Sequence, residues 1–429
     1  YWNQVGFVID YGNSVTVYVN GVGTTSTSWS GIMTNTSVPV LLGAATNIPA
    51  ARMLGSIDQV RFFNTALTDA QAEDCYTDET TTTAATLDFP AGAGCIAAYQ
   101  LDGNGDDLST NYNGTTTDIG YTGLKFQPDF VWIKNRQPGG AGYSHQLYDS
   151  IRGVTNVIFS NDTDQQYTRT QGLQIFNTNG FTVGSRADTN SGTMVSWSWY
   201  APTAESISAS GSQIASTVRK NVDAGFSIVQ GSFATNEAST KVVGHGLTSP
   251  KLIIYKATNI VLPWFNFGVH GGSVFGNNNV LRFNTDAAAN DSTFDITGTT
   301  FKVGSTGTAH TFIAYCYENI SGYQKVGSYT GNRPSTKTVY TTDDGTATGQ
   351  NGFKPSFLMI KDATTAGEDW IIVDNKREGA SAPTKVLYPN TNASEDAYTV
   401  INFTSDGFTV GDTGLANTSG ATIIYLAIA

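Results

Sequence analysis

A repeated pattern constrains the fold of this 429-residue chain more than any other feature. Residues 126–134 (FQPDFVWIK) match residues 353–361 (FKPSFLMIK), and residues 176–184 (FNTNGFTVG) match residues 403–411 (FTSDGFTVG). Both pairs of nine-residue segments are separated by the same 227 residues. Two matches at one spacing indicate a duplicated structural unit.

A third, more divergent copy lies between these two. Residues 250–256 (PKLIIYK) correspond to the first motif, and residues 301–304 (FKVG) correspond to the second. From the motif lysine to the motif glycine, the three separations are 50, 48 and 50 residues. Each copy then closes with an apolar strand that follows a glycine, at residues 192–199, 307–317 and 420–429. The sequence therefore predicts three copies of one unit.

The composition of the chain predicts an all-β fold. Charged residues make up 14% of the chain and glycines number 46, while Thr, Val, Ile, Tyr and Phe favour pleated backbone. Asn179-Gly180 and Asp406-Gly407 lie between paired phenylalanines, which predicts tight hairpins. The middle copy has Thr299-Thr300 there, so we expect it to turn differently. The closing strands lack polar alternation and are expected to lie centrally in antiparallel sheets.

The first part of the chain carries a different pattern. Val15, Val17 and Val19 alternate with polar residues before the turn signal Asn20-Gly21. Residues 55–63 (GSIDQVRFF) read as a strand, and Thr68 and Gln71 then have the spacing of a capping box that opens a helix. Over residues 1–77 this pattern resembles the C-terminal half of a laminin-G-like or concanavalin-like jelly roll. Residues 95–115 (CIAAYQLDGNGDDLSTNYNGT) resemble the opening strand and loop of a second module of that family.

The expected architecture is a set of tandem antiparallel β-sandwich domains, of jelly-roll or laminin-G-like type, in an elongated array. Each repeat is long enough to own a core, so the copies are expected to behave as beads on a string. The expected segments are the end of a lectin-like jelly roll (1–76), a Thr/Ala/Gly linker (77–94), the start of a second lectin-like module (95–120), repeat 1 (121–203), a linker (204–221), the divergent repeat 2 (222–320) and repeat 3 (321–429).

Four motifs together resemble modules found in tail-fibre and other virion structural proteins of marine phages. They are FQPDFVWIK, DSIRG at residues 149–153, FNTNGFTVG and GSYTGN at residues 327–332. The resemblance implies an extracellular location on a virion, a homotrimeric fibre, and a host surface glycan or receptor and other virion proteins as partners. The resulting hypothesis is a tail fibre or spike component that adheres through many weak sites. A capsid or tail decoration protein, a depolymerising tailspike and a bacterial surface adhesin remain alternatives.

Several function classes are disfavoured by the sequence. A net charge of −12 argues against nucleic-acid binding, which needs Lys and Arg to displace counterions. No run of about 18 apolar residues occurs, so membrane insertion is not expected. The chain begins inside a strand pattern at Tyr1, and we expect a longer polypeptide. The familiar hydrolase, metalloprotease and phosphate-loop motifs are missing from the sequence, and no enzyme activity is expected.

One segment has the outline of a calcium loop. Asp102, Asn104 and Asp106 alternate as in the first half of such a loop, but Asp107 stands where a glycine is needed and Asn113 where a glutamate is needed. A solvated turn is the favoured interpretation. The laminin-G resemblance keeps calcium open as a cofactor, and no other cofactor is expected.

The remaining ligand candidates are aromatic and charged residues of the repeats. Trp264 and Trp370 follow the motif lysines at similar spacing, with His145 in the first copy, and they serve either as sugar platforms or as core residues. His270 lies in an aromatic stretch, residues 263–272, that is expected to be a surface loop.

A charged pair also recurs. Asp149 and Arg152 correspond to Asp374 and Arg377, while the middle copy has no equivalent. The pair could bind an anionic sugar, but a local turn held by a charge-assisted hydrogen bond is the simpler explanation.

The cysteines give no disulfide framework. Cys75 and Cys95 either pair with each other or remain free, with free thiols favoured, and Cys316 is expected in the core.

Overall fold

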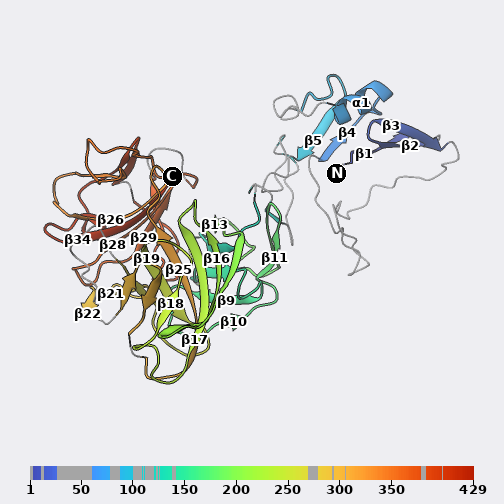
Figure 1. The fold of residues 1–429 in the computed structure, drawn as a ribbon. Coiled ribbons are helices and arrows are strands. Elements are labelled where there is room, and N and C mark those ends of the chain that lie inside the picture. The colour runs from blue at the N-terminus through green and yellow to red at the C-terminus, as the bar shows by residue number, and fades with distance from the viewer. Residues whose placement is uncertain are drawn as a thin grey trace. The chain divides into compact units, whose positions relative to one another are not determined.

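The computed structural model describes residues 3–10, 14–26, 60–77, 87–99, 109, 111, 120–121, 124, 126–137, 142–268, 279–291, 294–304, 306–377, 383–398 and 400–429. The chain divides into two compact units: residues 1–116 with 121–123, and residues 117–120 with 124–429 (Figure 1). Strands dominate the regular secondary structure of both units, which confirms the predicted all-β class. No helix in the described ranges is long and apolar enough to cross a membrane.

The first unit contains a small antiparallel sheet and a helix. The sheet consists of β1 (Val5–Asp10), β2 (Ser14–Val19) and β3 (Val22–Ser26) in that order. Asn20 and Gly21 form the β2–β3 turn with φ of 52° and 78°, as the Asn-Gly signal predicted. Helix α1 (Asp69–Thr77) follows a true capping box: Gln71 N donates to Thr68 Oγ1 at 3.2 Å, and Thr68 N donates to Gln71 Oε1 at 3.0 Å.

A second small sheet corrects two sequence-based boundaries. Strand β5 (Cys95–Tyr99) pairs antiparallel with β4 (Val60–Phe63), so it completes the first unit instead of opening a separate module. The described end of the expected 77–94 linker also packs on this unit. Arg61 Nη1 donates to the Phe89 carbonyl at 3.3 Å, and Ala93 is buried.

Each repeat of the second unit is built from two main sheets. In repeat 1 the order is β10 (Tyr167–Thr168), β9 (Asn156–Phe159), β8 (Gln146–Asp149), β7 (Phe130–Asn135), β13 (Met194–Trp199), facing β11 (Leu173–Asn177), β12 (Gly180–Val183), β6 (Gly120–Tyr121). In repeat 2 it is β14 (Thr203–Ile207), β16 (Ser216–Asn221), β17 (Phe226–Phe233), β25 (His310–Glu318), β19 (Pro250–Ala257), β20 (Phe265–Phe267), β21 (Asn279–Arg282), β22 (Asn290–Asp291), with β15 (Gln213–Ile214), β18 (Val242–Gly244), β24 (Thr300–Lys302), β23 (Asp295–Thr297). In repeat 3 it is β26 (Gln324–Thr330), β34 (Thr422–Ile428), β28 (Phe357–Asp362), β29 (Ile371–Asp374), with β27 (Lys337–Tyr340), β33 (Gly407–Val410), β32 (Ile401–Thr404), a short pair of β30 (Lys385–Val386) and β31 (Asp396–Ala397), and helix α2 (Gly414–Asn417).

The three copies share one strand register. The first-motif strands β7, β19 and β28 pair antiparallel with the closing strands β13, β25 and β34. Equivalent opposed pairs are Trp132 with Trp197, Ile254 with Tyr315, and Met359 with Leu426. Strands β25 and β34 are central as predicted, but β13 is an edge strand, which corrects the expectation for repeat 1.

The second motif forms a hairpin in every copy. Phe176 opposes Phe181, and Phe403 opposes Phe408, so both predicted hairpins form. Asn177 opposes Gly180 and Thr404 opposes Gly407, which places the two-residue turns at 178–179 and 405–406, one residue earlier than the expected Asn-Gly and Asp-Gly pairs. The middle copy also makes a hairpin, in which Thr297 opposes Thr300 and Gly298 supplies a φ of 33°. Gly298 corresponds to Thr178 and Ser405 of the other copies, so the turn lies at the same place and the middle copy has a glycine in it.

The three repeats share one core, which corrects the beads-on-a-string expectation for residues 124–429. Alternate residues of the motif strands point in opposite directions, because side chains alternate along a strand. One face joins a cluster contributed by all three repeats, while the other face of β19 and β28 lies in a core owned by that repeat. The shared cluster includes Phe130, Trp132, Trp197, Trp199, Phe226, Ile254, Phe283, Tyr315, Tyr317, Phe357, Met359 and Leu426.

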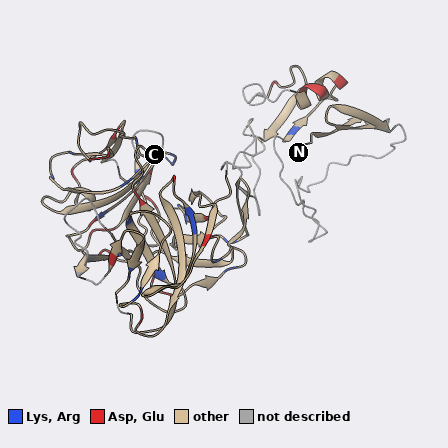
Figure 2. Ribbon diagram, viewed as in Figure 1, with Lys and Arg blue, Asp and Glu red and all other residues tan. Residues whose placement is uncertain are grey.

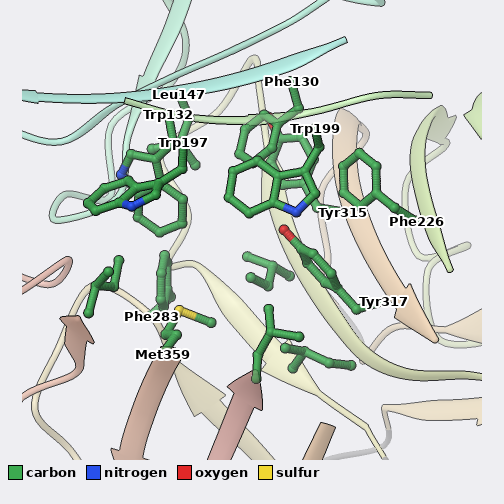
Figure 3. Packing of buried hydrophobic residues seen from close by; sticks show 14 of the residues in the cluster. Phe130, Trp132, Leu147, Trp197, Trp199, Phe226, Phe283, Tyr315, Tyr317 and Met359 are labelled. Atoms are coloured by element: carbon green, nitrogen blue, oxygen red, sulfur yellow. The ribbon is translucent and has the colours of Figure 1, made fainter. Parts of the chain in front are cut away.

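Aromatic rings in this cluster cross every boundary between repeats, and Figure 3 shows part of the cluster, with Phe130 beside Tyr315. Phe130 stacks on Tyr315 with ring centroids 4.2 Å apart, which joins repeats 1 and 2. Phe283 meets Trp370 edge to face at 5.0 Å, which joins repeats 2 and 3. Trp197 meets Phe357 at 5.7 Å, which joins repeats 1 and 3. The repeats therefore close into a ring around common aromatic packing.

The expected linker at residues 204–221 is also part of this structure. Strands β14 and β16 pair with each other and extend the large sheet of repeat 2. Ser216 and Val218 of β16 are buried, whereas Thr217, which lies between them in the sequence, is exposed. Such alternation is typical of a half-buried strand, and the abundance of Ser and Thr concealed it.

Candidate functional site

The motif lysines lie at the boundaries between repeats and are fully buried. Lys256 Nζ donates to the Thr163 carbonyl of repeat 1 at 3.0 Å and to its own repeat's Leu262 carbonyl at 2.7 Å. Lys361 Nζ donates in the same way to Asp286 of repeat 2 at 3.3 Å and to Glu368 of its own repeat at 2.7 Å.

Lys134 completes the cycle. Its Nζ donates to the Asn392 carbonyl of repeat 3 at 3.2 Å and to the Tyr143 carbonyl of its own repeat. The motif lysine of each repeat thus donates a hydrogen bond to the preceding repeat, and the motif lysine of repeat 1 donates one to repeat 3. Burial lowers the pKa of all three lysines to about 8.

The aromatic ligand candidates occupy the same boundaries. Trp264 Nε1 donates to the Phe159 carbonyl of repeat 1 at 2.8 Å, and Trp370 Nε1 donates to the Arg282 carbonyl of repeat 2 at 3.1 Å. Both indoles are fully buried, so their faces contact neighbouring side chains of the core. Of the two interpretations that the sequence left open, the structure places both residues in the core.

His145, at the corresponding position of repeat 1, is buried against repeat 3. Trp132 Nε1 donates to His145 Nδ1 at 2.9 Å. Burial, followed by the charges of Lys134 and Arg377, lowers the pKa of His145 well below its usual value, and the backbone of Tyr388 opposes this effect only partly. A neutral imidazole here is a structural group.

Asp149 and Arg152 form a buried ion pair at the boundary between repeats 1 and 2. Arg152 Nε donates to Asp149 Oδ2 at 2.5 Å, and the Arg152 backbone N donates to Asp149 Oδ1 at 2.9 Å, so the predicted local turn exists. Tyr315 of repeat 2 adds a hydroxyl that donates to Asp149 Oδ2 at 2.9 Å. Burial opposes ionisation of Arg152, but Asp149 and Tyr315 outweigh it and raise its pKa.

Asp374 and Arg377 repeat this arrangement between repeats 3 and 1. Arg377 Nε donates to Asp374 Oδ2 at 2.6 Å, and Trp197 Nε1 of repeat 1 donates to the same oxygen at 3.3 Å. Trp197 and Tyr315 occupy equivalent register positions on the closing strands. The predicted turn is therefore confirmed in both copies, whereas the hydrogen-bond donor from the neighbouring repeat was not predicted from the sequence.

The same register explains why the middle copy lacks the pair. The closing strand of repeat 3 carries Leu426 at the position of Trp197 and Tyr315. Leucine can donate no hydrogen bond, so a buried carboxylate on repeat 2 would lack the donor that the other two carboxylates receive. Repeat 2 has Gly268 after β20, where the other copies have the aspartate. The polar group and its partner are thus absent together.

The other candidates divide between described and undescribed residues. Asp102, Asn104, Asp106 and His270 lie outside the described residues. In the described ranges no group of three or more potential metal ligands occurs. Cys75, Cys95 and Cys316 carry free thiols, and Cys316 is in the core of repeat 2 as expected. Burial raises the pKa of Cys75 to about 11.

Comparison with known proteins divides the chain in the same two parts. Residues 1–73 match the concanavalin A-like lectin/glucanases superfamily. Residues 107–429 match a domain of unknown function, DUF7483, and this single model spans all three repeats. Searches of curated proteins and of solved structures returned no match. Since the second model covers most of the chain, the protein belongs to the DUF7483 family and carries a concanavalin-like segment in front of it.

Proposed function

We propose that this protein is a non-catalytic structural and adhesive component of a virion appendage, a tail fibre or spike, that attaches to glycans on a host surface. The observation that carries the proposal is the use of the recurring chemical groups. The motif lysines, Trp264, Trp370 and both Asp–Arg pairs join the repeats to one another. The recurring side chains that could take part in catalysis are therefore used in bonds that hold the ring of repeats together.

The concanavalin-like segment supplies the carbohydrate side of the proposal. Its superfamily includes lectins, which bind carbohydrate and do not depend on catalytic carboxylates to do so. Glucanases of this fold use paired acidic residues to cleave the glycosidic bond. The superfamily match therefore supports carbohydrate binding in general, and the absence of an acidic motif in the sequence favours binding over cleavage.

The virion location rests on the resemblance of the repeat motifs to phage appendage modules. Other virion proteins and a host surface glycan or receptor are the proposed partners. We also propose assembly of three chains into a fibre, since closure of a ring within one chain does not prevent it.

Three measurements on virions and on the full chain test the proposal. Mass spectrometry of separated heads and tails should find the chain with tails, whereas recovery with heads in high copy number would favour a decoration protein. Labelled full chain should bind host cells, and treating the cells with periodate, which oxidises sugars, should abolish binding. New reducing ends after incubation with host polysaccharide would identify a depolymerising tailspike and overturn the non-catalytic assignment.

A further inference from the structure

A polar cleft of about 580 Å³ opens at one edge of repeat 3. It lies between β26 and β27, the edge strands of the two sheets of that sandwich. The buried rings of Tyr329 and Tyr425 line its inner part. Lys251 and Asn319 of repeat 2 complete the wall. The volume falls in the range that holds small ligands.

The cleft is open because repeat 3 lacks strands that repeat 2 has. Strand β17 pairs with the closing strand of repeat 2 as β26 pairs with that of repeat 3. In repeat 2 the sheet continues from β17 to β16 and β14, whereas β26 is the last strand of its sheet. Val218 of β16 and Ile214 of β15 fill the core of repeat 2 at this edge. The same edge of repeat 3 is lined by lysines and other polar side chains together with tyrosine rings.

Three lysines line this cleft in a chain whose net charge is −12. Lys325 Nζ donates to the Asp343 carbonyl at 2.6 Å, and Lys251 Nζ donates to Ser249 Oγ at 2.9 Å. An ammonium group has three N–H donors, so both keep donors for a ligand. Lys337 on β27 is half-buried in the opposite wall. Figure 2 shows Lys, Arg, Asp and Glu scattered as short patches along strands and loops that are mostly uncharged.

The lining also holds one acidic residue, Asp344, against the three lysines. The Asp344 carboxylate accepts hydrogen bonds from the backbone N and the hydroxyl of Thr346, both at 2.9 Å. These bonds lower the pKa of Asp344 and fix its carboxylate to its own loop. Burial lowers the pKa of Lys325, although Asp343 and Asp344 oppose this effect. An incoming anion would therefore replace water around a partly desolvated cation.

The rest of the lining suits a sugar. Thr338 presents an exposed hydroxyl group, and Tyr340 is only half-buried. Hydroxyls both donate and accept, as sugar hydroxyls require, and a tyrosine ring offers an apolar face to C–H groups. A side chain at Gly327 would meet the Tyr425 hydroxyl at 2.6 Å, so glycine keeps this strand close to the buried ring.

We propose that the cleft between β26 and β27 binds an anionic saccharide that carries sulfate or carboxylate groups. This site deepens the glycan-binding function proposed above and rests on it. Lysine acts as a compact point charge, so it accepts either anionic group without the planar fit that arginine imposes. The net charge of the chain keeps nucleic acids away by repulsion, whereas a short anionic saccharide meets only the local positive cleft.

Isothermal titration of the full chain tests the proposal with three probes: a κ-carrageenan hexasaccharide, whose only charged groups are sulfates, an oligogalacturonate, whose only charged groups are carboxylates, and a neutral dextran oligosaccharide. The triple variant Lys251→Gln, Lys325→Gln, Lys337→Gln should weaken binding of the anionic probes about tenfold or more. The matched control Lys241→Gln, Lys302→Gln, Lys376→Gln removes the same charge elsewhere and should change affinity less than about twofold. Thr338→Trp keeps every charge, fills the cleft and should also abolish binding.

The possible outcomes distinguish failure of the proposed cleft site from failure of the proposed adhesive function. Binding of only one anionic probe identifies sulfate or carboxylate as the recognised group. Equal loss in both triple variants, or unchanged affinity in Thr338→Trp, would assign binding to general attraction and overturn the cleft. Failure of both anionic probes to bind also overturns it, while periodate-sensitive attachment to cells would leave the adhesive function standing. Melting temperatures of all variants within a few degrees of the parent exclude misfolding as the cause.

Discussion

The indole Nε1 of Trp197 donates a hydrogen bond to the carboxylate of Asp374 at 3.3 Å, although 177 residues separate them. Trp197 belongs to repeat 1 and Asp374 to repeat 3, so this bond joins the first and last repeats of the ring. The guanidinium of Arg377 lies 6.0 Å from the Trp197 ring centroid and completes the group. The first and last repeats of the series are therefore in direct contact.

Replacing Trp197 should weaken this closure measurably. Trp197→Phe keeps a ring but leaves the Asp374 oxygen without its indole donor, which costs about 1–3 kcal/mol for a buried acceptor. Trp199→Phe is the matched control, because it removes the same part of a ring that contacts Phe130 and Phe226. Urea unfolding followed by circular dichroism should show the larger loss for Trp197→Phe. Equal losses would mean that ring volume, and not the hydrogen bond, holds this boundary.

Removing Asp149 should be more damaging. Asp149→Ala leaves Arg152 charged and buried, with only carbonyl and hydroxyl partners, and this costs about 3–5 kcal/mol. Asp412→Ala breaks an ion pair whose two side chains, Arg333 and Asp412, are 52% and 54% exposed, so it should change stability by less than about 1 kcal/mol. Thermal melts of the two variants give the comparison. An Asp149→Ala protein as stable as Asp412→Ala would show that the buried pair contributes nothing.

Stability should rise with pH in mildly alkaline solution. The motif lysines have a pKa of about 8 when folded and 10.5 in the reference state, so between these values the unfolded chain binds more protons. A stability curve rises with pH wherever the unfolded state binds more protons. The free energy of unfolding should therefore increase from about pH 8 to about pH 9, where the three lysines outweigh Cys75 and Cys316, whose raised pKa values act in the opposite direction. Lys256→Met should reduce that increase by roughly a third, and a decrease across this window contradicts the prediction.

Two thiols should be protected by burial. The pKa of Cys75 is raised to about 11 and that of Cys316 to about 12, against 9.0 in the reference state. Because the thiolate is the reactive form, alkylation at pH 8 should be slowed about a hundredfold or more compared with the urea-unfolded chain. Mass spectrometry after timed iodoacetamide treatment measures both rates. Labelling of Cys75 at the unfolded rate would mean that helix α1 opens readily.

Local features of the fold were predictable because their causes are local. The Asn20-Gly21 turn, the capping box of Thr68 and Gln71, and the paired-phenylalanine hairpins each depend on residues within a few positions. The Asp149–Arg152 turn was predictable for the same reason. The repeat spacing, in turn, predicted that β7 and β28 would be equivalent strands, and they are.

The ring was not predictable, because its partners are distant in sequence and carry no local mark. A strand such as β28 is apolar on both faces, and the pattern cannot say whether the second face meets its own sandwich or another repeat. The lysine partners are backbone carbonyls of Thr163, Asp286 and Asn392, which any residue could supply. The missing pair of the middle copy was a usable signal, since Leu426 stands where Trp197 and Tyr315 donate. The cleft depends on strands equivalent to β14 and β16 being absent from repeat 3, and no sequence motif marks a missing strand.

Native-state hydrogen exchange tests most directly whether the three repeats share one core. Exchange of the full chain at increasing urea, resolved by peptide mass spectrometry, gives the opening free energies of β7, β19 and β28 separately. If the packing of Phe130, Tyr315 and Phe357 is common to all repeats, the three strands will open in one cooperative step at high urea, with the same opening free energy and the same urea dependence. Three separate openings, with repeat 3 exchanging while repeat 1 stays protected, would contradict a shared core and restore independent domains.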